Sequence, residues 1–308
     1  MKLIFFGSDD FAAAHLDALL QTSHQMVACV TQPDKQKGRG LKVVFSPIKE
    51  IALKHKIPLF QPESFKDPEI IRDLQKFDAD LFIVIAYGRI LPQSVLDIPR
   101  KMAINVHGSL LPKYRGAAPI NWATLNGDKE TGVSIIKMNV HMDAGEILTE
   151  EKLAILDTDD AVTLRQKMAQ KGKNLLMKTL EAIDQNSFVL KKQDERQVTL
   201  APKLTKELGR ISWQKNAEEI HRLVGGLQPW PGAFTSYKGK QLKLYSTKVV
   251  PEKFPGACGQ VLKLDKNGIL VKTGKEALLI QEVQLEGSNK MTAQQFIIGH
   301  RLEVGVIL

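Results

Sequence analysis

Short apolar runs alternate with amphipathic stretches through the first half of the chain, and this alternation restricts the possible folds more than any other feature. The apolar runs of strand length lie at residues 2–6, 26–30, 81–86 and 103–106. Residues 9–21 and 46–56, which lie between such runs, have the spacing of amphipathic helices. Strands that alternate with helices are typical of a mostly parallel sheet with helices on both faces. The pattern therefore predicts an α/β, Rossmann-like domain.

The second half of the chain has a different pattern. Two further strands are expected at 132–139 and 146–155, and a long helix at 160–184. Polar and charged residues then become frequent, which is typical of a linker. Several short alternating segments follow, punctuated by Gly, Asn and Pro, and they predict a small β-barrel or sandwich. The expected boundaries are an α/β domain over 1–188, a linker over 189–207 and a C-terminal domain over 208–308.

Composition and charge narrow the class of protein. The longest apolar run, residues 81–86, is far shorter than the ~20 residues that a membrane helix needs. The two cysteines, Cys29 and Cys258, have no C-x-x-C or Cys/His spacing, which argues against a disulfide framework or a zinc site and favours a cytoplasmic location. The net charge of +9 favours a polyanionic partner, but it does not distinguish nucleic acid from a membrane surface or from a contribution to solubility.

The turn after the first strand, GSDDFA at residues 7–12, indicates whether the domain can bind a dinucleotide cofactor. A dinucleotide-binding turn follows the pattern G-x-G-x-x-G, of which only Gly7 is present. Asp9 and Asp10 stand where a pyrophosphate would approach the backbone, and like charges repel. The sequence therefore disfavours a nicotinamide-dependent dehydrogenase.

Two polar residues at the end of the run 103–106 are candidates for chemistry. Asn105 and His107 are two residues apart, so on a strand both side chains point to the same face of the sheet. Open α/β sheets bind ligands at the carboxyl ends of their strands. An Asn amide can stabilise an oxyanion, and a His side chain can move a proton near neutral pH. The alternative is that both residues only cap a loop.

Asp143, in the segment NVHMDAGEIL, is a third candidate. It lies between two predicted strands, and Gly145 permits a tight turn close to a ligand. An aspartate near His107 would favour the imidazolium and fix the orientation of the ring. His141 is the competing choice, and Asp143 could equally be an ordinary turn residue.

Two segments carry a resemblance to a known family. NVHGSLLPKYRGAAPI at 105–120, together with MDAGEI at 142–147, resembles the active-site signature of the formyltransferases that use 10-formyltetrahydrofolate. The segments FGSDDFAAAHLDALL, VTQPDKQKGRG, VIAYGRILP, TLAPKLTKELGRISW and QPWPGA extend the resemblance along the chain. It implies transfer of the formyl group to the α-amino group of methionine on initiator Met-tRNA, for translation initiation. It also implies an oligonucleotide-binding-like (OB-like) barrel for the C-terminal domain.

The resemblance implies roles for individual residues. Asn105 donates to the oxyanion, His107 assists charge stabilisation and proton movement, and Asp143 pairs with His107 and relays protons. Whether His107, Asp143 or a bound water takes the amine proton stays open. No metal is expected, because a formyl group on nitrogen is already activated for transfer. The implied residues for binding the folate co-substrate are Ile85, Tyr87, Gly88, Leu91, Ser109, Leu110, Leu111 and Pro112.

A basic stretch, residues 31–49, carries five Lys or Arg against one Asp. A solvated charge run is the usual explanation for such a segment. The resemblance implies instead that it contacts the acceptor stem of the tRNA, with help from the linker and the basic C-terminal domain. The implied tRNA-binding residues are Lys35, Lys37, Arg39, Lys42, Lys203 and Lys206. We expect a monomer that binds no membrane.

Three other functions fit part of the sequence. A formyltransferase acting on an amino sugar nucleotide or a purine-pathway amine would share the same three catalytic residues, and the basic stretch counts against it. A hydrolase that deformylates the folate would use water in place of the amine. A non-catalytic RNA-binding protein would explain the charge but not Asn105, His107 and Asp143.

Overall fold

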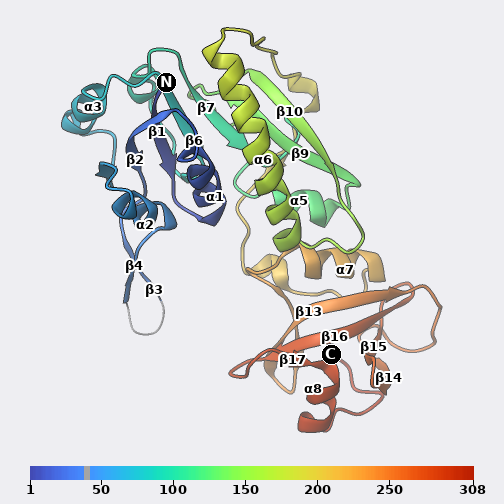
Figure 1. Cartoon of the computed structure of the whole chain (residues 1–308). Helices are drawn as coiled ribbons and strands as arrows, with labels where there is room; N and C mark the ends of the chain where they lie inside the picture. The colour runs from blue at the N-terminus through green and yellow to red at the C-terminus, as the bar shows by residue number, and fades with distance from the viewer. Residues whose placement is uncertain (38–41) are drawn as a thin grey trace. The chain divides into compact units, whose positions relative to one another are not determined.

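The computed structural model describes residues 1–37 and 42–308, with the backbone alone for residues 35–37, 42 and 43. The described chain divides into two compact units, each of which is made of three segments (Figure 1). Unit 1 comprises Met1–Pro119, Glu130–Ala154 and Arg165–Ala201. Unit 2 comprises Ile120–Lys129, Ile155–Leu164 and Pro202–Leu308. These units do not test the predicted domain boundaries at residues 188 and 208, which stay a prediction.

A sheet of seven strands forms the centre of unit 1, in the order β10-β9-β7-β6-β1-β2-β5. The strands are β1 (Lys2–Gly7), β2 (Gln25–Val30), β5 (Leu59–Phe60), β6 (Leu81–Ile85), β7 (Met102–His107), β9 (Glu130–Lys137) and β10 (Ile147–Ala154). The five strands from β7 to β5 pair in parallel, and β9 and β10 add antiparallel pairs at one edge. The prediction of a mostly parallel α/β sheet is confirmed.

The strand composition explains this arrangement. β1 and β6 consist almost wholly of apolar residues and are buried along their length, as strands covered on both faces are. The helices that accompany the sheet are α1 (Asp10–Leu19), α2 (Pro47–Lys54), α3 (Pro68–Gln75), α4 (Gln93–Leu96) and α6 (Ala161–Asp184). Gly172 of α6 lies against His15 of α1 and Val106 of β7, so α6 packs on the strand that carries the candidate site.

Local capping fixes where the first helices begin. Asp9 accepts a hydrogen bond from the backbone N–H of Ala12, at 3.0 Å, and Ser46 accepts one from Lys49, at 3.1 Å. Asp9 therefore serves as the N-cap of α1. Two short strands, β3 (Lys35–Lys37) and β4 (Lys42–Val44), pair with each other as a separate antiparallel ribbon in the basic stretch.

Unit 2 holds the antiparallel strands that the sequence predicts near its C-terminal end. They are β12 (Ala233–Tyr237), β13 (Lys240–Val250), β14 (Val261–Asp265), β15 (Gly268–Lys272), β16 (Ala277–Leu285) and β17 (Met291–Thr292). The helices that accompany them are α5 (Pro119–Asn126), α7 (Ala217–Gly226), α8 (Ala293–His300) and the short 3-10 turn Glu207–Gly209. Pairing follows the path β12-β13-β16-β15-β14, and β17 pairs with β16. One single bridge joins Arg210 to Phe234 of the edge strand β12, and another joins Ile307 to Gln260, the residue before β14. Closure into a barrel stays a prediction.

The segment after α6 belongs to unit 1 as far as Ala201. Lys191 forms an antiparallel bridge with Ile147, and a 3-10 turn follows at Glu195–Gln197. β11 (Leu200–Ala201) then pairs in parallel with β8 (Arg115–Gly116). Within the part of the chain that the structure describes, no helix is long and apolar enough to cross a membrane.

Candidate functional site

The three candidate catalytic side chains meet at the carboxyl end of β7. Asn105 and His107 lie on β7, between β6 and β9, so the sheet holds their backbone on both sides. The Asn105 amide Nδ2 donates to Asp143 Oδ1 at 3.2 Å. His107 Nδ1 lies 3.6 Å from the same carboxylate oxygen. The structure therefore brings together the three residues that the sequence selects, and one oxygen of Asp143 faces both partners.

A hydrogen bond to the main chain determines which nitrogen of the buried His107 ring carries a hydrogen. The residue is 5% exposed, and Nε2 lies 2.9 Å from the main-chain oxygen of Tyr114. A carbonyl oxygen only accepts, so Nε2 must carry a hydrogen and donate it. The neutral ring then presents the lone pair of Nδ1 to Asp143, whereas the imidazolium presents an N–H. His107 can therefore gain or lose a proton at Nδ1 without breaking its bond to Tyr114.

Asp143 lies in the turn between β9 and β10, in a left-handed conformation with φ of 52°. Its second carboxylate oxygen, Oδ2, accepts a hydrogen bond from the backbone N–H of Gly116, at 2.8 Å. Two residues later, a Cβ at Gly145 would lie only 1.8 Å from the carbonyl oxygen of Lys137. The turn can therefore approach the end of β9 only because this position is glycine.

Two hydroxyl groups hold the loop that follows His107. Ser109 is fully buried, and its hydroxyl donates to the carbonyl oxygen of Lys113 at 2.6 Å. Ser134 of β9 accepts the backbone N–H of Leu111 at 3.0 Å, and its Oγ lies 2.7 Å from the carbonyl oxygen of Ser109. The Ser109 side chain therefore shapes the loop from inside.

The predicted folate-binding residues differ in exposure. Leu110 and Pro112 are half-buried, and Gly88, with φ of 75°, is exposed. Tyr87 packs edge-on against Phe6, and its hydroxyl is buried with no hydrogen-bond partner among the described residues. Burial raises the pKa of Tyr87 to about 12. The remaining members are buried side chains, namely Ile85, Leu91, Ser109 and Leu111. Their contact with folate stays a prediction.

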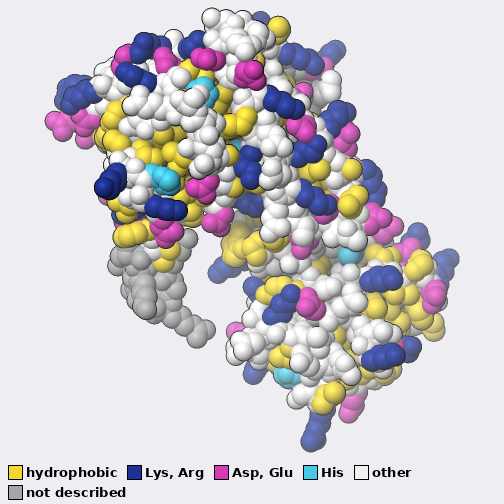
Figure 2. All heavy atoms as spheres, in the orientation of Figure 1, with side chains coloured by type: hydrophobic (Ala, Val, Ile, Leu, Met, Phe, Trp, Pro, Cys, Tyr) yellow, Lys and Arg dark blue, Asp and Glu magenta, His cyan; other side chains and the backbone are white. Residues whose placement is uncertain are grey.

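The predicted tRNA-binding residues fall in three groups. Arg39 lies outside the described residues. Lys35, Lys37 and Lys42 are described by their backbone alone, on the β3 and β4 strands. Lys203 and Lys206 are exposed and belong to unit 2. On the face drawn in Figure 2, Lys and Arg side chains are spread over the surface with Asp and Glu among them.

Gln193, which contacts the Asp143 turn, and Arg115, which contacts Gln193, are not among the residues that the sequence pattern predicts for the site. The Gln193 amide nitrogen lies 2.8 Å from the carbonyl oxygens of both Asp143 and Gly145. Its amide oxygen accepts from Nε and Nη2 of Arg115, at 3.0 and 2.8 Å. Arg115 also forms an ion pair with Glu195, and the hydrogen bond from Arg115 lowers the pKa of that carboxyl group. No short-range pattern marks these residues, because Arg115 and Gln193 lie 78 positions apart.

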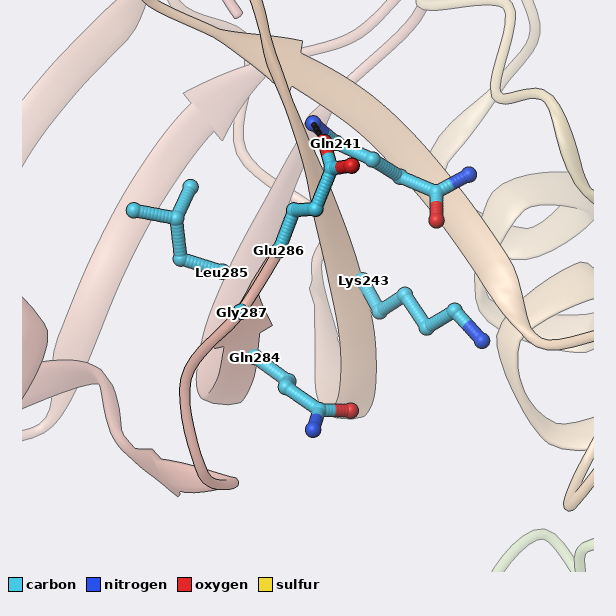
Figure 3. A pocket seen from close by; sticks show the side chains of 6 residues that line it. All are labelled: Gln241, Lys243, Gln284, Leu285, Glu286 and Gly287. Atoms are coloured by element: carbon cyan, nitrogen blue, oxygen red, sulfur yellow. Dashed lines mark hydrogen bonds between the residues drawn. The ribbon is translucent and has the colours of Figure 1, made fainter. Parts of the chain in front are cut away.

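A metal site, or a cavity away from β7, would be an alternative functional site. In the described residues, no group of three or more His, Cys, Asp or Glu is placed to hold a metal ion. A cavity of about 180 Å³ lies in unit 2 (Figure 3). Its lining residues are Gln241, Lys243, Gln284, Leu285, Glu286 and Gly287. Lys243 donates to the carbonyl oxygen of Pro231, and the lining holds no His paired with a carboxylate.

Comparisons with known proteins cover nearly the whole chain. A family model described as "Formyl transferase" matches residues 1–180, and one described as "Formyl transferase, C-terminal domain" matches residues 203–301. The methionyl-tRNA formyltransferase of Caldanaerobacter subterraneus subsp. tengcongensis is 45% identical, over 100% of both chains. That of Geobacter metallireducens is 42% identical, over 100% of this chain and 98% of its own.

Solved structures resemble the chain in fold. HypX from Aquifex aeolicus, in complex with tetrahydrofolic acid, has a TM-score of 0.68 and 18% identity, over 98% of this chain and 48% of that one. An N-formyltransferase from Helicobacter canadensis, in complex with folinic acid and dTDP-3-aminofucose, has a TM-score of 0.68 and 18% identity, over 94% of this chain and 100% of that one. Identity this low indicates a common fold alone.

Proposed function

The chain belongs to the methionyl-tRNA formyltransferase family, and from this premise we propose that it transfers the formyl group of 10-formyltetrahydrofolate to the α-amino group of methionine on initiator Met-tRNA. The product, formyl-Met-tRNA, serves translation initiation. The observation that carries the proposal is the meeting of Asn105, His107 and Asp143 at the carboxyl end of β7. The chain is 42% to 45% identical, along its whole length, to methionyl-tRNA formyltransferases, and this favours Met-tRNA over an amino sugar nucleotide as the acceptor.

Asn105 is suited to stabilise the tetrahedral intermediate. The amine nitrogen attacks the formyl carbon, and the carbonyl oxygen becomes an oxyanion. An Asn amide has two N–H groups, and the bond to Asp143 uses one of them. The second N–H can donate to the oxyanion. The bond to Asp143 also fixes the amide plane before the reaction begins, which is the condition for effective electrostatic stabilisation.

Proton movement can be assigned to a pair of atoms. The attacking amine must lose a proton, and the departing folate nitrogen must gain one. His107 Nε2 is already occupied by the carbonyl oxygen of Tyr114, so the ring exchanges protons at Nδ1. Asp143 Oδ1, 3.6 Å away, stabilises the imidazolium that forms. Nδ1 and Oδ1 therefore form the relay between the amine and the folate nitrogen, without a metal ion.

The binding sites for the two substrates extend the proposal. Backbone and half-buried groups at Gly88, Leu110 and Pro112 contact the folate, and buried side chains support them from behind. The supporting side chains are Ile85, Tyr87, Leu91, Ser109 and Leu111. The basic stretch, with Lys35, Lys37, Arg39 and Lys42, contacts the acceptor stem, and Lys203 and Lys206 contact phosphates.

The proposed enzyme has two domains joined by a linker. Residues 1–188 form a catalytic domain, residues 189–207 connect it to the rest, and residues 208–308 form a tRNA-binding, barrel-like domain. The enzyme acts as a cytoplasmic monomer. A sequence-independent contribution from the basic C-terminal domain would weaken as salt concentration rises.

The test compares formyl acceptors side by side. Formyl transfer from 10-formyltetrahydrofolate is measured with charged initiator Met-tRNA, with free methionine and with water alone. We expect formyl-Met-tRNA as the product, no transfer in His107→Ala and weaker transfer in Arg39→Ala. Formate release that does not depend on tRNA would overturn the assigned acceptor.

A further inference from the structure

The Asp143 turn must be held by its surroundings. A left-handed backbone at a residue other than glycine is unfavourable and persists where neighbouring groups determine it. The carboxylate has its own partners, Asn105 and Gly116. The main chain of the turn needs partners as well, because the carboxylate direction changes if the peptide units on either side rotate.

Gln193 supplies these main-chain partners. Its amide nitrogen has two hydrogens and lies 2.8 Å from two carbonyl oxygens, those of Asp143 and Gly145. Its amide oxygen faces two N–H groups of Arg115, at 3.0 and 2.8 Å. Carbonyl oxygens only accept and a guanidinium only donates, so just one orientation of the amide fits. All the donors and acceptors of the Gln193 side chain are therefore used.

Arg115 connects Gln193 to the loop that holds the other catalytic groups. Arg115 is 9% exposed, and its backbone N–H donates to Thr199 at 2.9 Å. On either side of it, Tyr114 accepts from His107 and Gly116 donates to Asp143. Three consecutive residues thus hold the imidazole, the Asp143 main chain through Gln193, and the Asp143 carboxylate.

We infer that Gln193 is a positioning residue of this active site: by bonding both carbonyls of the Asp143 turn and the Arg115 guanidinium, it directs the Asp143 carboxylate at His107 and Asn105. The inference rests on the proposed function for its kinetic consequences. Groups that orient a catalytic residue typically contribute about 10- to 100-fold to activity. Gln193 acts through Asp143, so its loss should lower kcat and leave the KM of both substrates nearly unchanged.

The experiment uses two variants of the full chain and one matched control. Gln193→Glu keeps an oxygen for Arg115 but removes both N–H donors and places a negative charge near two carbonyl oxygens. Gln193→Ala removes the whole amide. Gln170→Glu, on the exposed surface of α6, is the control for the same chemical change. Steady-state kinetics give kcat and KM for each variant. Each change is also made in the Asp143→Ala background, where single-turnover formylation rates are compared. If Gln193→Ala fails to fold, the comparison of Gln193→Glu with Gln170→Glu still tests the inference.

The expected result is a fall in kcat of about 10- to 100-fold in both Gln193 variants, with KM values within about threefold of the parent. In the Asp143→Ala background, the Gln193 changes should cost almost nothing further, because the residue that they position is absent. An equal loss with and without Asp143, or turnover in Gln193→Glu within about twofold of the parent, would overturn the inference.

A spectroscopic readout separates this inference from the proposed function. The imidazole ¹⁵N resonances of His107 report the distance and charge of Asp143 whether or not the protein turns over. We expect them to shift in Gln193→Glu and to stay in place in Gln170→Glu. A parent enzyme that formylates no acceptor would refute the proposed function alone. Unmoved His107 resonances would refute the positioning role.

Discussion

His107 donates its Nε2 hydrogen to the main-chain oxygen of Tyr114 at 2.9 Å, and this bond leaves Nδ1 as the ring nitrogen that faces Asp143. The two ring nitrogens thus have separate tasks, because one anchors the ring and the other faces a carboxylate. Substitutions that imitate one nitrogen at a time can separate these tasks.

His107→Gln should fold with nearly the parent stability and lose most of its turnover. A glutamine amide can reach the position of Nε2 and donate to Tyr114, but it has no titratable atom at the position of Nδ1. Loss of general acid–base catalysis typically costs about 10²- to 10⁴-fold. Single-turnover formylation rates and thermal unfolding test this. His141→Gln, on an exposed residue of the neighbouring turn, is the control and decides between the two histidines. A larger loss in His141→Gln would assign the role to His141.

Asn105→Ala should lower kcat by about 10²- to 10³-fold, because it removes the proposed oxyanion donor. The KM for the folate should change little, since an oxyanion exists only along the reaction path. Steady-state kinetics with saturating Met-tRNA measures both constants. Asn174→Ala, on an exposed position of α6, is the matched control. A rise in KM with unchanged kcat would show that Asn105 binds the ground state instead.

Gly145→Ala should impair both folding and catalysis. The added Cβ would lie 1.8 Å from the carbonyl oxygen of Lys137, so the turn must move and take Asp143 with it. Displacement of this kind typically costs about 1 to 3 kcal/mol in the free energy of unfolding. Urea titrations of the parent, Gly145→Ala and Gly299→Ala give the comparison, since a Cβ at Gly299 meets nothing within 4 Å. Equal stability of the two variants would contradict the steric explanation.

The regular parts of the fold were predictable because they are long enough to show a period. β1, β6 and β7 are apolar runs, and α6 and the strands of unit 2 lie close to their predicted positions. Elements of two to four residues, such as β5, β8, β11 and α4, are too short to show any period. α8 did carry a signal that was missed, because Thr292 and Gln295 form a capping box at its start.

The candidate site was predictable to a different extent for each residue. Asn105 and His107 share a strand, so their spacing alone places both side chains on one face. Asp143 follows Asn105 by 38 positions, and only the resemblance to a family connected the two. Gln193 bonds the main chain of the Asp143 turn from 50 positions away in the sequence, and no periodicity records such a contact.

Acid should destabilise the fold through His15, between pH 6.5 and about 4. Burial lowers the pKa of His15 from 6.5 to about 4, so the folded state keeps the ring neutral. The unfolded chain binds the proton below pH 6.5, and stability that is present above this pH is lost as the pH falls to about 4. The difference corresponds to roughly 3 kcal/mol in the free energy of unfolding.

His15→Leu should therefore flatten the pH dependence of unfolding over this range. Urea titrations at several pH values give the slope for the parent, for His15→Leu and for the exposed control His55→Leu. All three proteins contain the same carboxyl groups, so the difference between their slopes reports the substituted histidine. The same slope in His15→Leu as in the parent would show that His15 is protonated without cost in the fold.

Removing two exposed lysines should weaken tRNA binding in a salt-dependent way. Lys203 and Lys206 are exposed and lie at the start of the last segment of unit 2, Pro202–Leu308. If each neutralises one phosphate, the double alanine variant should reduce the slope of log K against log salt concentration by about 1 to 2. Filter binding of initiator Met-tRNA between low and moderate salt measures that slope. Lys54→Ala with Lys178→Ala removes the same charge from exposed helical positions. An equal loss of slope in this control pair would show that net charge, rather than contact by Lys203 and Lys206, sets the affinity.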